Sequence, residues 1–177
     1  NKSTGSTFEF AYIASSSIFN NEFVAFNSTS AYSPTFVGRI ENQDLNALSN
    51  VDYLIITQTN MLGEAQRLAN YYNNKFNVQV VDVNKIYNEF SSGSKDITAI
   101  RDFVTRLKTI TGNLKYVLLL GDTSYDFKNR IANNSDIIPS YQSENSQDYS
   151  ASYVTDDYFV MTTPQSDNQL YNNLPTI

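Results

Sequence analysis

The sequence contains no cysteine and no histidine. Their absence excludes a thiol nucleophile, a Ser-His-Asp triad, a zinc site built on Cys or His, and haem or iron–sulfur ligation within this chain. Disulfides are excluded as well. A chain without cysteine is allowed in any redox compartment, so cysteine usage gives no information on location. If the chain has a chemical centre of its own, we expect it to be built on carboxylates.

Positive charge and long apolar runs are also scarce. Twelve Lys and Arg residues stand against eighteen Asp and Glu residues, which gives a net charge of −6 without a basic patch. Nucleic-acid binding is therefore not expected, because it needs Lys and Arg to neutralise phosphates. No apolar run approaches the roughly 18 residues of a membrane span. The N-terminus lacks a signal-peptide pattern and begins at Asn1 rather than Met, so we expect a processed or excised chain.

Strands and helices are expected to alternate from residue 51 onward. Apolar runs predict strands at 51–57 and 78–83, and apolar residues at spacings of three and four predict helices at 61–72 and 97–110, with a short helix or turn at 84–90. Asp96 suits the N-cap of the second long helix and Gly112 its C-terminal stop. The pattern predicts an α/β fold in which right-handed crossovers place helices over the faces of one parallel sheet.

The most informative stretch is residues 115–126, where four apolar residues run directly into Gly121 and Asp122. A short apolar run that ends in a turn signal predicts a central strand buried on both faces. Gly121 allows a sharp turn out of the sheet. Asp122 then stands at the carboxyl end of the strand, which is the edge where open α/β sheets bind ligands.

Both ends of the chain are more polar. Residues 1–35 predict short β-strands that are a lead-in or the end of a preceding domain, and residues 36–40 predict a further short strand. A single helical turn is possible at residues 44–48. Residues 127–152 read as a long polar loop anchored by Ile137, Ile138 and Pro139. Residues 153–161 predict a last strand that carries the acidic pair Asp156 and Asp157.

Several carboxylates could converge at the carboxyl edge of the sheet, namely Asp122, Asp126, Asp156, Asp157 and Asp167. Oxygen-only clusters suit Ca²⁺ or Mg²⁺. The alternative is that these residues cap turns or face solvent. A phospho-acceptor Asp at a strand end is also possible, but Thr57 and Gln58 stand where an acidic pair would be expected. A two-metal phosphoesterase site is excluded, because such sites need His ligands.

Eight segments together resemble the gingipain-like cysteine peptidases, in particular the sortase-type members that act at the cell surface in type IX secretion. They include Leu-Leu-Gly-Asp at 119–122 and Thr-Asp-Asp-Tyr-Phe at 155–159, and lie at residues 42–45, 51–57, 65–68, 80–83, 86–93, 96–103, 115–122 and 153–159. The likeness runs in one register over about residues 35–160.

The resemblance implies a caspase-like α/β fold, with residues 36–177 as the first subdomain of the catalytic domain. In the family the catalytic His and Cys come later in the chain, so no catalytic residue is expected here and the second subdomain is an expected partner. The family also binds Ca²⁺, which implies Asp122 as a metal ligand, with Asp167 and Asp157 as further candidates. Thr176 departs from the family pattern, in which an acidic residue often follows the proline.

Two functions follow as hypotheses. The first is an inactive N-terminal subdomain of a secreted or surface-bound cysteine endopeptidase whose substrates are proteins of the secretion system. It would support the substrate cleft and hold calcium. The second is a non-enzymatic α/β binding or interaction module at the cell surface.

Overall fold

The computed structural model describes residues 2–4, 7–9, 26–27, 29, 31–135, 137–143, 147–148, 150 and 152–162. The chain divides into two compact units, residues 1–40 and residues 41–177. In the first unit, β1 (Lys2–Thr4) and β2 (Thr7–Glu9) form an antiparallel hairpin. Residues 36–40, predicted as a strand, form no regular structure, and their large side chains are exposed.

The second unit is built on a three-stranded parallel sheet in the order β4-β3-β5. Its strands are β3 (Tyr53–Thr57), β4 (Val78–Asp82) and β5 (Tyr116–Leu119). β3 pairs from Tyr53 with Val78 to Thr57 with Asp82, and on its other side from Tyr53 with Tyr116 to Ile56 with Leu119. The predicted parallel sheet is confirmed. The central place given to residues 115–121 was wrong, because β3 lies in the middle and β5 at the edge of the described sheet.

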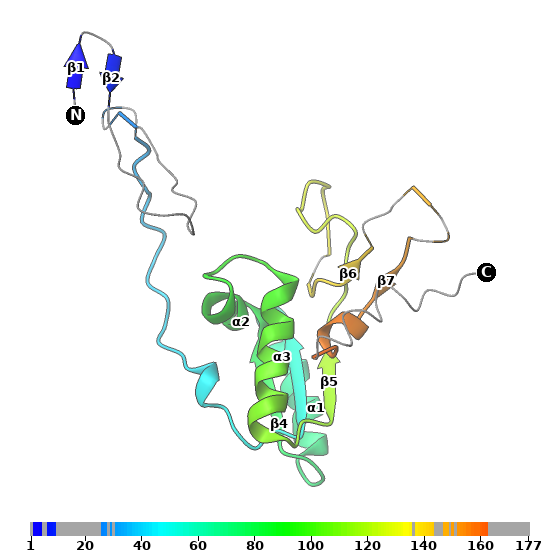
Figure 1. Ribbon diagram of the computed structural model, residues 1–177. Helices are drawn as coiled ribbons and strands as arrows, with labels where there is room; N and C mark the ends of the chain where they lie inside the picture. The colour runs from blue at the N-terminus through cyan, green and yellow to red at the C-terminus, as the bar shows by residue number, and fades with distance from the viewer. Residues whose placement is uncertain are drawn as a thin grey trace, which may run out of the picture. The chain divides into compact units, whose positions relative to one another are not determined.

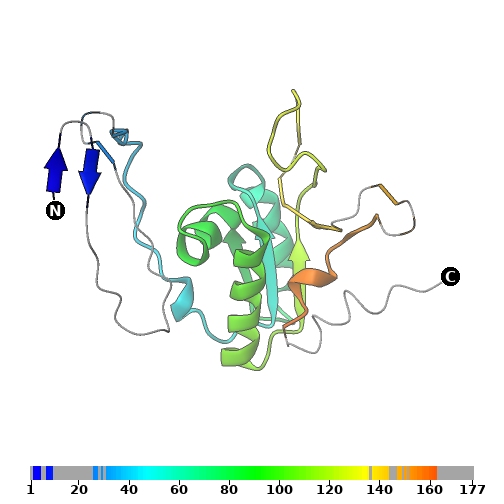
Figure 2. The same ribbon diagram turned by 45° about the horizontal axis from the view of Figure 1, so that its top comes forward.

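Helices cover the two faces of this sheet (Figure 1). α1 (Leu62–Tyr72), entered through a 3₁₀ turn η2 (Thr59–Met61), packs on one face. α2 (Val83–Phe90) and α3 (Ile97–Thr111) lie together on the other. Figure 2 shows the same layers from a second direction. The predicted α/β class, a parallel sheet flanked by helices, is thereby confirmed.

Two apolar clusters hold these layers together. The larger joins Leu54 and Ile56 of β3 to Phe103 and Leu107 of α3, all of which are completely buried. The smaller lies under α1, where Ile55 packs against the alanines of that helix. β5 is covered less well than β3, since its side chains from Val117 to Leu119 are only half-buried. The strand predicted to be buried on both faces is therefore only partly so.

The helix termini follow the sequence. Asp96 accepts a hydrogen bond from the backbone N–H of Thr98 at 2.8 Å and so caps α3, as predicted. Gly112 ends α3 with a φ of 62°, in the left-handed region that favours glycine. A single 3₁₀ turn, η1 (Leu45–Ala47), follows Asp44, whose carboxylate accepts from the backbone of Ala47 at 2.9 Å.

The last described segments are short. β6 (Tyr141–Gln142) and β7 (Val154–Thr155) form a two-stranded antiparallel pair, and the 3₁₀ turn η3 (Asp157–Phe159) follows β7. The single strand predicted over residues 153–161 was wrong. The hydroxyl of Thr155 accepts from the backbone N–H of Asp157 at 3.1 Å, which turns the chain. Phe159 is then buried in the cluster under α3.

Candidate functional site

The carboxyl ends of the three strands meet at one edge of the sheet, together with the loop of residues 91–96 and the loop that begins at residue 121 (Figures 1 and 2). Thr57 ends β3 and is completely buried, and its hydroxyl donates to the carbonyl of Leu120 at 2.7 Å. Asp82 ends β4 and accepts from the backbone N–H of Asn84 at 2.8 Å and from the hydroxyl of Thr59. The side chains of Thr57 and Asp82 are thus already hydrogen-bonded to neighbouring residues at this edge.

Gly121 is required where the chain leaves β5. A Cβ atom at this position would lie 2.6 Å from Cγ2 of Ile137 and 3.0 Å from Cγ1 of Ile138. The carbonyl oxygen of Asp122 accepts the backbone N–H groups of both isoleucines, at 2.9 and 3.0 Å. The segment of Ile137 and Ile138 therefore folds back against the strand end, as its apolar character suggested. These hydrogen bonds join the two ends of the loop that runs from Asp122 to Ile137.

Two predicted carboxylates organise this loop. The carboxylate of Asp122 accepts from the backbone N–H of Thr123 at 2.9 Å and from the hydroxyl of Ser135 at 3.1 Å. Asp126 is buried, and its carboxylate accepts from the backbone N–H of Ile131 at 2.6 Å. Both residues therefore act as hydrogen-bond acceptors that shape the loop, which was the alternative to metal binding. Each Asp122 oxygen still has a lone pair for a further partner.

The structure does not assemble the predicted metal site from described residues. Asp157 is exposed in η3, and Asp167 lies outside the described residues. Within the described part of the chain, no three acidic, histidine or cysteine side chains are grouped closely enough to hold a metal ion. Of the described predicted ligands, Asp122 directly follows a strand of the parallel sheet, whereas Asp157 lies on η3 after β7.

A polar cavity of about 540 Å³ opens beside Asp122. Gln58 and Asn60, which follow β3, line it on one side, and Lys95, before α3, lies in its wall. The loop after β5 supplies the remaining wall, formed by Phe127, Lys128, Asn129, Asn134, Ser135 and Ile137. None of these described lining residues is acidic. Ser135 separates the cavity from the Asp122 carboxylate to which it donates.

A smaller and largely apolar cavity of about 300 Å³ adjoins the first. It is lined in part by Ile97, Pro139 and Gln142, and it shares Lys95 and Phe127 with the polar cavity. Phe127 is 56% exposed, so its ring forms part of an accessible wall. Sequence reasoning missed both cavities, because it followed carboxylates. The only signal was the pair of amide residues, Gln58 and Asn60, placed directly after a buried strand.

Farther along this edge, η3 is held against α3 through aromatic and cationic side chains. The ring of Tyr158 stacks on Tyr141 with 5.0 Å between centroids and an interplanar angle of 18°. The guanidinium of Arg101 lies 5.0 Å from the centroid of the Tyr158 ring, and its Nε donates to the carbonyl of Met161 at 2.9 Å. The side chain of Arg101 therefore fixes the segment that follows β7.

The comparisons with known proteins identify the family. The model of peptidase family C25 matches residues 46–177. The chain belongs to peptidase family C25, the gingipain family. Among solved structures, it resembles the dimeric latent PorU from Porphyromonas gingivalis, with 30% identity and a TM-score of 0.63. The match covers 76% of this chain and 14% of the PorU chain, so the C25 segment described here corresponds to a small part of that protein.

The C25 assignment confirms the resemblance seen in the sequence, and the PorU structure confirms the caspase-like α/β class of the fold. A search of curated proteins found no match. None of the helices in the described part of the chain has the length and apolar character needed to cross a membrane.

Proposed function

We propose that this chain is the first subdomain of the catalytic domain of a PorU-type cysteine endopeptidase, and that the catalytic Cys and His belong to a later part of the same protein. The observation that carries the proposal is the combination of a C25 fold with a sequence that has no Cys and no His. A cysteine peptidase needs a thiolate to attack the peptide carbonyl and a His to act as general base and acid. This chain supplies neither group, so by itself it is inactive.

In the intact enzyme, the chain would support the catalytic domain and contribute to the surface that faces the substrate or the second subdomain. Its buried sheet supports one side of the catalytic domain, and its carboxyl edge offers polar side chains to a substrate or to the second subdomain. We further propose that the intact protein is secreted or held at the cell surface, where it processes proteins exported by type IX secretion. The likeness to PorU supports this proposal.

The test compares two proteins with a panel of fluorogenic peptides. The 177-residue chain alone should show no turnover. The full-length parent should cleave at least one peptide, and a thiol-alkylating reagent should abolish this cleavage. Turnover by the isolated chain would contradict the proposal. A parent that lacks alkylation-sensitive cleavage and has no Cys and His in its later part would favour the alternative, a non-enzymatic binding module at the cell surface.

A calcium site is a separate proposal, in which Asp122 is one oxygen ligand and Asp167 and Asp157 are further candidates. The carboxylate of Asp122 is exposed at the strand end and keeps acceptor capacity, which suits Ca²⁺. Because a ligand that binds only the native state stabilises it, Ca²⁺ should raise the melting temperature of the chain. The Asp122→Ala variant should lose this rise. An equal rise in Asp122→Ala, or none in the wild type at millimolar Ca²⁺, would remove the proposal.

A further inference from the structure

The polar cavity at the carboxyl edge has a charge opposite to that of the chain. The chain carries a net charge of −6, yet the described cavity walls contain Lys95 and Lys128 and no acidic residue. A cavity of about 540 Å³ is within the size range of ligand sites in proteins. Its place beyond the carboxyl ends of parallel strands is also the usual position of ligand sites in open α/β sheets.

The ammonium group of Lys128 is the positive charge that would attract an acidic ligand to this cavity. Its ammonium lies 5.4 Å from the centroid of the Phe127 ring, and it forms no ion pair with any described residue. The carboxylates of Asp122 and Asp126, in the same loop, accept hydrogen bonds from Thr123, Ser135 and Ile131, and neither forms an ion pair with Lys128. The ammonium is therefore placed beside an aromatic wall, with no protein carboxylate to neutralise it in the described structure.

The amide side chains add a second chemical requirement. Gln58, Asn60 and Asn129 line the cavity, and their side-chain amides have no hydrogen-bond partner within the described residues. An amide side chain donates and accepts at once, so it pairs with another amide as readily as with water. Three such groups around one cavity match the alternating N–H and C=O groups of a peptide backbone.

The adjoining apolar cavity supplies the third requirement. Ile97, Pro139 and the exposed ring of Phe127 can cover an apolar side chain, and Phe127 and Lys95 are shared by both cavities. Asp96 also lines the smaller cavity, where its carboxylate caps α3 by accepting from the backbone N–H of Thr98, so the acidic group of the ligand belongs in the polar cavity. A ligand that lies across the shared wall would place an acidic group near Lys128 and an apolar group near Ile97. An acidic residue next to an apolar residue in an extended peptide satisfies both.

We infer that the two adjoining cavities form a binding site for an acidic peptide segment, in which a carboxylate side chain meets Lys128 and a neighbouring apolar side chain enters the smaller cavity. The choice of a peptide over an acidic glycan rests on the proposed function, because a peptidase handles polypeptides. The site contains no catalytic group. Its occupant is a segment of the protein substrate.

The test measures binding of capped hexapeptides to the 177-residue chain by calorimetry at low ionic strength. The probes have the sequences Glu-Leu-Ser-Glu-Leu-Ser, Gln-Leu-Ser-Gln-Leu-Ser and Lys-Leu-Ser-Lys-Leu-Ser. The Glu peptide should bind saturably, the Gln peptide about fivefold more weakly, and the Lys peptide not at all, because a single partly exposed charge pair contributes modestly. Added salt should weaken the Glu peptide most.

Two variants and a matched control assign this binding to the cavity. Lys128→Glu should reverse the order of the Glu and Lys peptides, and Asn60→Asp, on the opposite wall, should weaken the Glu peptide alone. Lys75→Glu makes the same charge change in the turn between α1 and β4, at the other end of the sheet, and should leave all affinities unchanged. Circular dichroism should show that all three variants are folded.

Three results would overturn the inference. They are the absence of saturable binding by the Glu peptide, an unchanged preference in Lys128→Glu, and binding of trigalacturonate in place of the peptides, which would indicate an acidic glycan. These results are independent of turnover by the full-length parent. A peptidase parent without peptide binding here would leave the proposed function intact, and binding here with an inactive parent would contradict the proposed function alone.

Discussion

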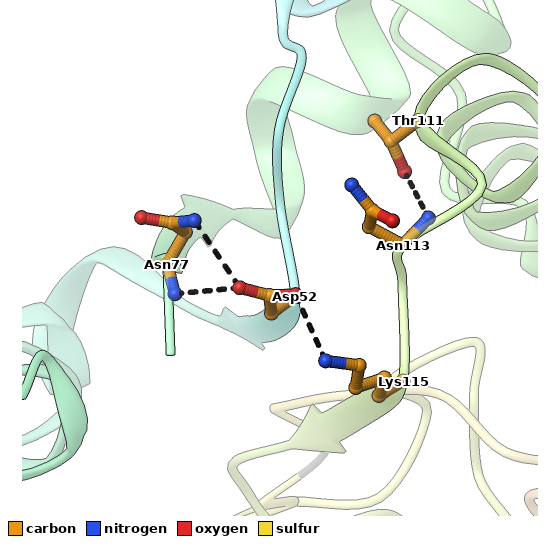
Figure 3. A network of polar contacts seen from close by, with 5 residues as sticks. All are labelled: Asp52, Asn77, Thr111, Asn113 and Lys115. Atoms are coloured by element: carbon orange, nitrogen blue, oxygen red, sulfur yellow. Dashed lines mark hydrogen bonds and ion pairs between the residues drawn. The ribbon is translucent and has the colours of Figure 1, made fainter. Parts of the chain in front are cut away.

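The carboxylate of Asp52 joins the start of β3 to the start of β4 by accepting the backbone N–H of Asn77 at 3.0 Å (Figure 3). The same oxygen accepts from the side-chain amide of Asn77 at 3.2 Å, and the other oxygen lies 3.4 Å from the ammonium of Lys115, just before β5. One carboxylate therefore aligns the amino ends of three neighbouring strands. The polar cavity lies at the opposite, carboxyl end of the sheet.

The first prediction concerns acid stability. The hydrogen bond from the backbone of Asn77, together with Lys115, holds the pKa of Asp52 below its ordinary value. A lowered folded-state pKa stabilises the protein above the unfolded-state pKa, and this contribution is lost as pH falls through the folded-state value. Asp52→Asn should therefore be less stable at neutral pH, and should lose less stability than the wild type between about pH 5 and pH 2. Urea unfolding at several pH values measures both effects; parallel pH profiles would contradict the prediction.

The second prediction concerns Glu89 of α2. Burial raises the pKa of Glu89, but hydrogen bonds from the backbone of Leu45 and from Gln43 and Asn46 outweigh it, so the pKa lies below its ordinary value. Glu89→Gln keeps the shape of the side chain and replaces one charged acceptor oxygen with a donor. We expect a loss of about 1 kcal/mol in the free energy of unfolding, because hydrogen bonds to a charged group at a half-exposed site are worth no more than this.

Denaturant unfolding measures that loss, and Glu64→Gln is its control. Glu64 lies on α1, and among the described residues its carboxylate forms only an exposed ion pair with Arg67. It should change stability by less than Glu89→Gln, since exposed ion pairs contribute little. Equal losses in the two variants would show that the bonds from residues 43–46 to Glu89 do not stabilise the fold.

The third prediction concerns Gly121. Gly121→Ala should destabilise the protein, because the new Cβ would lie 2.6 Å from Ile137, a β-branched residue with few alternative rotamers. The expected loss is about 1–3 kcal/mol, which is typical of overpacking. Gly63→Ala, at a helical position with no atom within 4 Å of the added Cβ, should be neutral or stabilising. Thermal unfolding compares the two, and a neutral Gly121→Ala would show that the loop base is free to shift.

The fourth prediction concerns the segment after β7. Tyr158→Leu removes the ring that lies between Tyr141 and Arg101, while its apolar volume is partly kept. Residues 152–162 should then exchange backbone amide protons faster, whereas exchange in β3 should be unchanged, since the stack fixes a local segment. Tyr125→Leu, at an exposed site, is the control. Faster exchange in β3 as well would indicate that the stack supports the whole sheet.

The sequence was sufficient to predict the elements whose signals are local. The apolar stripe of α3, its cap at Asp96 and its glycine at Gly112 all depend on residues within a few positions of one another, and the structure confirms each. The order of the strands depends on which chains pair. An apolar run cannot distinguish a central strand from an edge strand when the pairing partners are distant in sequence. That is why β5 was predicted at the centre and β3 was not.

The candidate site was less predictable for a related reason. Asp122 was placed correctly at a strand end, because a Gly-Asp pair after an apolar run is a local signal. The cavity walls come from residues near 58–60, 95 and 127–137, which are brought together only by the folded sheet. Polar amides and lysines in loops have no periodicity, so nothing in the sequence separated Lys128 or Asn60 from an ordinary solvated side chain.

β5 pairs with β3 alone among the described strands, and this has a practical consequence for the molecule in solution. Within the described residues nothing pairs with its outer backbone, whose N–H and C=O groups can hydrogen-bond to another extended polypeptide. Only Lys115, at the entry to the strand, adds a charge that discourages such pairing, since the residues from Tyr116 to Leu120 are apolar. Concentrated preparations of the chain should therefore self-associate, and short strand-like peptides should compete with that association.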